Sequence, residues 1–148
     1  MTFLSANNYT LLSSKSYEYA TKNSDIVGLS TNCHSESILC FGGGRVGAKT
    51  IRLIACAKCF EVLSETELNK PELRGASYWY FTPSVSFGFS DTPQVLQNKG
   101  DKWSLIAGVQ TSFYRMSWLL DGKGGYRLGA ITNNYNTLIK YIYIKNRI

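Results

Sequence analysis

The sequence has a single histidine, His34, in 148 residues. A Ser-His or Cys-His nucleophilic pair requires a histidine that faces its nucleophile, and sequence neighbours such as Cys33 and His34 seldom do so. The grouped acids are typical of solvated loop charges: Glu61, Glu65, Glu67 and Glu72. We therefore expect a protein that binds a ligand without catalysing a reaction.

The sequence also lacks long runs of one kind of residue. No stretch approaches the roughly 18 apolar residues of a membrane-spanning helix. The start, MTFLSANNYTLLSSK, has neither the positively charged lead-in nor the uninterrupted apolar core of a signal peptide, so the expected location is cytoplasmic, leaderless secreted or mature secreted. The net charge is +6, but the basic residues are scattered singly, so we expect no specific binding of nucleic acid.

Aromatic residues and glycines are abundant, with ten Tyr, seven Phe, three Trp and thirteen Gly. This composition is typical of strands and turns, and the length fits one domain. Short apolar runs separated by turn residues follow one another along most of the chain. We predict a polar segment at residues 1–14 and a single all-β domain at 15–148, built as an antiparallel β-sandwich or barrel.

The clearest predicted strand is residues 84–90, SVSFGFS, where every second residue is apolar. This alternation predicts a half-buried strand. Residues 113–120, FYRMSWLL, alternate in the same way, and we assign Tyr114 and Trp118 to the core. A glycine-rich reversal, its partner strand and a closing strand are predicted at 121–125, 126–131 and 137–145.

A glycine-rich motif divides the segment 39–63, LCFGGGRVGAKTIRLIACAKCFEVL. It contains G-x-G-x-x-G at Gly42, Gly44 and Gly47, after an apolar run and before a longer one. With an acid at Glu61 or Glu65, the segment resembles the start of an NAD-binding Rossmann domain. That resemblance implies that the three glycines hold a dinucleotide phosphate at the N-terminus of a helix.

The residues after the motif favour a strand. No Gly, Pro, Asn or Asp lies between Ala48 and Leu68 to end such a helix. Apolar residues alternate from Ile51 to Cys59, and the phase slips at Phe60, as a bulge or tight turn would cause. We therefore predict that the glycines form a hairpin loop, and we keep the dinucleotide-binding domain as an alternative.

The cysteines allow three interpretations. Cys33 and Cys40 form a C-x6-C pair, which is not a common partner for the C-x2-C pair of Cys56 and Cys59 in a zinc site. In a straight strand Cys56 and Cys59 would also point to opposite faces. We favour buried free thiols over disulfides or zinc, and we expect no metal or cofactor.

Aromatic rings next to polar loop residues suit carbohydrate, because sugars present C–H patches and hydroxyl groups together. Residues 77–81, SYWYF, carry rings on both faces of a predicted strand. We predict a lectin-like site at Trp79, Tyr80, Asp121, Tyr126, Arg127, Asn133, Asn134 and Asn136. A protein–protein interaction module that uses the same aromatic residues is the alternative, and exposed edge strands would allow a homo-oligomer.

Overall fold

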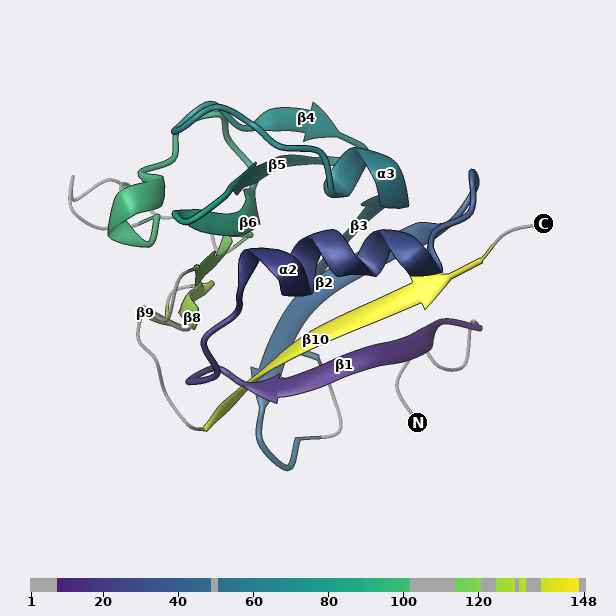
Figure 1. The fold of residues 1–148 in the computed structure, drawn as a ribbon. Helices are drawn as coiled ribbons and strands as arrows, with labels where there is room; N and C mark the ends of the chain where they lie inside the picture. Colours follow the sequence, from purple (N-terminus) through teal and green to yellow (C-terminus); the bar gives the residue numbers. More distant parts are fainter. Residues whose placement is uncertain are drawn as a thin grey trace.

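The computed structural model describes residues 8–48, 51–101, 114–120, 125–129, 131–132 and 137–146. Over these ranges the chain forms two antiparallel sheets that pack on each other, with short helices at several places around them (Figure 1). The sheets are open and do not close into a barrel in the described part of the chain. The prediction of an all-β, sandwich-like domain is confirmed.

The first sheet joins the two ends of the chain. Its order is β1 (Thr10–Ser16), β10 (Leu138–Lys145), β2 (Ile38–Arg45) and β3 (Leu53–Lys58), and each neighbouring pair is antiparallel. β1 begins inside the segment 1–14 that the sequence marks as polar and unpatterned. Main-chain pairing with β10 makes it a strand, because its serine and lysine side chains supply no apolar alternation.

The second sheet is a meander in which sequence order is also spatial order. It contains β4 (Glu72–Arg74), β5 (Ser77–Thr82), β6 (Ser86–Ser90), β7 (Met116–Leu119), β8 (Gly125–Leu128) and β9 (Ile131–Thr132). Turn residues between short apolar runs favour this arrangement of hairpins.

Short helices connect the strands. α2 (Asn23–Val27) and the 3-10 helix η1 (Gly28–Asn32) follow β1 and lie over the sheet that holds β10 (Figure 1). Asp25 accepts a hydrogen bond from the Lys22 backbone N–H at 3.0 Å and so fixes the first turn of α2. α3 (Cys59–Val62) occupies the position where the alternation slips phase, and η2 (Gln97–Lys99) follows β6. No helix among the described residues is long and apolar enough to cross a membrane.

Aromatic rings fill the space between the sheets. The Phe41 ring on β2 lies 5.9, 4.5 and 5.7 Å from the rings of Trp79, Phe87 and Trp118 on the second sheet, measured between centroids. These side chains are fully or almost fully buried. The prediction that Trp118 belongs to the core is confirmed, whereas Tyr114 is 66% exposed and the prediction for it is wrong.

The second sheet is buried more completely than the alternation predicts. Every residue of β6 is buried, so the prediction of a half-buried strand is wrong. Gly88 leaves room for Tyr80 and the β7 backbone to pack closely against β6. A Cβ at this position would lie 2.7 Å from the Tyr80 hydroxyl oxygen and 2.0 Å from the Met116 carbonyl oxygen. Ser86 accepts a hydrogen bond from the buried Gln97 amide at 3.3 Å, which satisfies a polar group on that face.

The glycine motif lies in a strand and its following turn. Gly42 and Gly44 pair with β10 inside β2, so the hairpin-loop prediction is wrong for these two residues. Close packing explains Gly42, because a Cβ there would lie 2.2 Å from the Leu53 carbonyl oxygen. Gly47 is in the turn after β2 with φ of +80°, a conformation that favours glycine. The strand leads into antiparallel β3, which differs from the parallel architecture that the dinucleotide-binding alternative requires.

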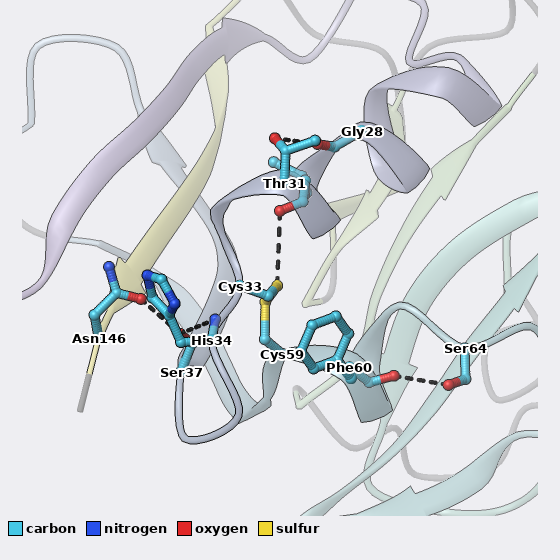
Figure 2. Close-up of a disulfide and its surroundings, with 10 residues drawn as sticks. Gly28, Thr31, Cys33, His34, Ser37, Cys59, Phe60, Ser64 and Asn146 are labelled. Atoms are coloured by element: carbon cyan, nitrogen blue, oxygen red, sulfur yellow. Dashed lines mark hydrogen bonds between the residues drawn. A yellow bond between two sulfur atoms is a disulfide. The ribbon is translucent and has the colours of Figure 1, made fainter. Parts of the chain in front are cut away.

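The four cysteines form two disulfides, Cys33–Cys59 and Cys40–Cys56, so the prediction of free thiols is wrong. Cys40 and Cys56 are direct register partners in β2 and β3. Cys33 follows η1 and meets Cys59 at the start of α3, beside Phe60 (Figure 2). Cys56 and Cys59 therefore bond different partners, on different sides of the sheet. The choice of partner depends on the tertiary structure.

Candidate functional site

A cavity of about 140 Å³ lies between the first sheet and the segment that contains α2 and η1. Its polar and aromatic lining comes from β1, from the residues around α2, from β7 and from β10: Ser13, Lys15, Tyr19, Thr21, Asp25, Trp118 and Lys140. Ile26, Leu29 and Ile142 supply apolar walls. We call this cavity the Lys140 pocket.

Strand alternation points Lys140 toward the core. Leu138, Lys140, Ile142 and Ile144 are the buried inward-facing residues of β10, and Lys140 is 3% exposed. Lys15 on β1 is its direct register partner. Two lysines of neighbouring strands therefore line the same cavity, one buried and one exposed.

The Lys140 amine is held by neutral groups and by aromatic rings. Its Nζ donates to the Tyr19 carbonyl oxygen and to Thr21 Oγ1, both at 2.7 Å. It lies 5.4 Å from the centroid of the Trp118 ring and 5.9 Å from those of Tyr17 and Tyr19. No carboxylate of the described residues forms an ion pair with it. Burial lowers the pKa of Lys140 to about 7, against a smaller opposing effect of the Asp25 charge.

Tyr19 and Asp25 form the mouth of the pocket. The Tyr19 hydroxyl donates to Asp25 Oδ2 at 2.9 Å, and this hydrogen bond is the main cause of the raised pKa of Tyr19. Lys15 Nζ lies 5.1 Å from the centroid of the Tyr19 ring. Tyr19 is 36% exposed, so the cavity is accessible to solvent on this side.

The charges around the pocket are unequal. Lys15 and Lys140 contribute two amines, whereas Asp25 is the only acidic residue that lines the cavity within the described ranges. One oxygen of Asp25 already accepts hydrogen bonds from Tyr19 and from the Lys22 backbone. The arrangement is suited to a small ligand that carries an anionic group and hydroxyl groups.

None of the predicted sugar-binding residues that the structure describes lines the Lys140 pocket. Trp79, Tyr80 and Arg127 are fully buried, with hydrogen bonds from Trp79 Nε1 to the Arg74 carbonyl oxygen, from the Tyr80 hydroxyl to the Met116 carbonyl oxygen and from Arg127 Nη1 to the Asp101 carbonyl oxygen. They offer no surface to a ligand. Asp121, Asn133, Asn134, Asn136 and the side chain of Tyr126 lie outside the described residues. The described part of the chain does not assemble the predicted site.

Among the pocket residues, Lys140 has a signal in the sequence that does not depend on aromatic residues. In TLIKYIYIK, Lys140 has the same phase as Leu138, Ile142 and Ile144, so it lies on the apolar face of a predicted strand. A lysine at such a position is seldom fully buried without a special role or partner. Tyr19 and Asp25 carried no comparable signal, because a turn and a short helix bring them to the cavity.

Comparison with known proteins gives no relative for this chain: no family model, no curated protein and no solved structure matches it. The fold alone does not define a ligand, since one fold carries many functions. Function is therefore argued from the geometry and charge of the Lys140 pocket.

Proposed function

We propose that this chain is a non-enzymatic carbohydrate-binding module whose Lys140 pocket takes a sugar residue that bears a carboxylate. The observation that carries the proposal is the convergence of Lys15 and Lys140 on one cavity beside the Tyr19 ring. A carboxylate between the two amines would offset their mutual repulsion and the cost of burying Lys140.

The remaining lining supports a sugar over a simple inorganic anion. Ile26, Leu29 and Trp118 give apolar contact for the C–H patches of a ring, and Thr21 and Asp25 give acceptors for hydroxyl groups. A cavity of about 140 Å³ suits a single small ring. The pocket is thus expected to hold one residue at the end of a glycan, with the rest of the glycan outside.

Calorimetric titration with the methyl glycosides of glucuronic acid and glucose tests the proposal. These probes differ at the carboxylate, and we expect the uronide to bind at least about tenfold more tightly, which corresponds to about 1.4 kcal/mol. Lys15→Met is expected to remove most of that preference, since it deletes the exposed amine and leaves the fold intact.

Lys145→Met is the matched control. Like Lys15, Lys145 lies near a tyrosine ring, with its Nζ 5.4 Å from the Tyr9 ring centroid. It is on β10, however, and belongs to the outward-facing residues of that strand. Binding of the uronide should be unchanged in this variant. Equal affinity for the two glycosides, or an equal loss in Lys15→Met and Lys145→Met, would refute the proposal.

A further inference from the structure

The hydrogen bonds of Lys140 can both be made by an unprotonated amine. A neutral primary amine has two N–H groups and one lone pair, and Lys140 Nζ has two oxygen acceptors at 2.7 Å, the Tyr19 carbonyl and Thr21 Oγ1. In the unprotonated form these oxygens satisfy both N–H groups, and neither hydrogen bond requires the lone pair. Because Lys140 lines the cavity, a molecule bound there lies next to this side chain.

We propose that Lys140 is a covalent attachment site, whose Nζ forms an imine with the carbonyl carbon of a small aldehyde or 2-oxo acid in the pocket. The inference rests on the proposed function only in that the same cavity admits a small anionic ligand. The carbonyl compound is the co-reactant, and its carboxylate would lie toward Lys15, the second amine of the pocket.

The reaction needs no oxidant or reductant. The lone pair of Nζ forms a C–N bond as the C=O double bond opens, and one amine proton passes to the carbonyl oxygen to give a carbinolamine. The hydroxyl group then leaves as water with the second amine proton, and the C=N bond forms. The step is reversible by water, so the protein returns to the free amine when the ligand is released.

The environment of Lys140 favours this reaction over reaction at other lysines. An exposed lysine has a pKa of about 10.4 and is almost entirely protonated at neutral pH. Burial lowers the pKa of Lys140 to about 7, which leaves a large fraction of the amine as a nucleophile. The titratable groups around it are Lys15, Tyr17, Tyr19 and Asp25, and none of these forms an ion pair with Nζ among the described residues.

Reductive trapping on the full chain tests the inference. The folded protein is incubated at pH 7 with glyoxylate and cyanoborohydride, and each lysine is followed by peptide mass spectrometry. Trapping adds the mass of the probe less one oxygen atom. We expect Lys140 to be modified at least about tenfold faster than the exposed lysines, given its larger unprotonated fraction. Modification of Lys140 at the rate of the exposed lysines, or more slowly, overturns the inference.

Variants separate the covalent step from ligand recognition. Lys140→Arg should carry no adduct at this position while the other lysines react as before. Lys15→Met should slow the modification of Lys140 by glyoxylate but leave that by propionaldehyde, which has no carboxylate, unchanged. Lys145→Met should change neither rate. If Lys15→Met slows both aldehydes equally, the assigned role of Lys15 is wrong.

The two proposals fail in distinguishable ways. The methyl glycoside of glucuronic acid cannot open to an aldehyde, so its binding reports recognition without covalent chemistry. If this glycoside binds and Lys140 is not selectively trapped, the attachment site is refuted and the binding function stands. If Lys140 is selectively trapped by both aldehydes and the glycoside does not bind, the attachment site stands and the acidic-sugar function is refuted.

Discussion

Two buried basic side chains of this protein, Arg115 and Lys140, differ in whether a carboxylate balances their charge. Arg115 is 1% exposed and forms a bidentate ion pair with the fully buried Asp101, with Nε–Oδ2 at 2.9 Å and Nη2–Oδ1 at 2.8 Å. Lys140 is 3% exposed, and its Nζ donates to two neutral oxygens, lies near aromatic rings and forms no ion pair with a described residue. The first charge is balanced within the protein, and the second is not.

The surroundings of each side chain explain its role. Arg115 also donates to Thr92 Oγ1 at 2.9 Å and to the Gln94 carbonyl oxygen, so it ties the segment after β6 to the start of β7. Arg127 adds a hydrogen bond to the Asp101 carbonyl oxygen at 2.6 Å. Each of these hydrogen bonds from Arg115 and Arg127 has an acceptor within the protein, so the network stabilises the fold. Lys140 lines a cavity instead, and a buried amine without a counter-ion costs stability unless a ligand supplies the charge.

Breaking the Arg115–Asp101 pair should have the largest effect on the fold. Asp101→Asn keeps the shape of the side chain but removes the buried counter-ion of Arg115. The remaining carboxylate partner, Asp91, lies 3.7 Å from Arg115 Nη1 and is 38% exposed. We expect a loss of about 3 kcal/mol in the free energy of unfolding, because removal of one partner of a buried pair is strongly destabilising and the partly exposed Asp91 compensates the Arg115 charge only in part. Urea denaturation followed by tryptophan fluorescence measures this loss.

Glu72→Gln is the control for that experiment. Glu72 pairs with Arg74 at 3.3 Å, but its side chain is 60% exposed, so water screens the interaction. We expect a change below about 1 kcal/mol. A similar loss in Asp101→Asn and Glu72→Gln would show that the buried pair has no special structural weight.

Removal of the Lys140 amine should change how stability depends on pH. The pKa of Lys140 is about 7 in the folded protein and near its ordinary 10.5 in the unfolded chain. Between these values the unfolded state binds a proton that the folded state has released, so the stability of the natural sequence rises with pH across this window. Below pH 7 the amine is protonated in both states, and the full cost of burying the charge is present.

In Lys140→Met this gain is absent. The difference in unfolding free energy between the natural sequence and the variant should therefore change by up to about 1.4 kcal/mol per pH unit in the middle of the window. Denaturation at pH 7, 8 and 9 measures the slope, and the subtraction cancels groups that titrate in both proteins. Parallel stability curves for the two proteins would show that Lys140 is not a buried amine of lowered pKa.

The strands could be predicted from the sequence because alternation is local. Met116 and Trp118 and the closing strand with Ile142 follow the period of a sheet, and each is buried as its phase requires. The disulfide of Cys40 with Cys56 could not be predicted, because it depends on the register of β2 against β3. Alternation also cannot tell whether a second face is covered, so the burial of Arg115 does not follow from the sequence pattern.

The candidate site was predictable only in part. The phase of Lys140 within TLIKYIYIK places it on the apolar face of its strand, and this is visible in the sequence. Its pairing with Lys15 requires the first and last strands of the described chain to be neighbours, a contact that no local pattern encodes. The sequence predicts a sugar-binding role for Trp79 and Tyr80 because they are aromatic. In a small sandwich, however, large rings are above all core residues.

Among these substitutions, Tyr19→Phe should have the smallest effect on stability and binding. It separates the contribution of the Tyr19 hydroxyl from that of the ring and the two lysines. The ring beside Lys15 and Lys140 is kept, and the hydrogen bond from the Tyr19 hydroxyl to Asp25 Oδ2 is lost. We expect stability to fall by less than about 1 kcal/mol, because this bond is exposed and the Lys22 backbone N–H still donates to Asp25. Affinity for the methyl glucuronide, measured by titration calorimetry, should change by less than about threefold, since the aromatic surface and both amines remain. A loss of tenfold or more would mean that the Tyr19 hydroxyl itself contacts the ligand, and recognition would then depend on a neutral donor more than on the two lysines.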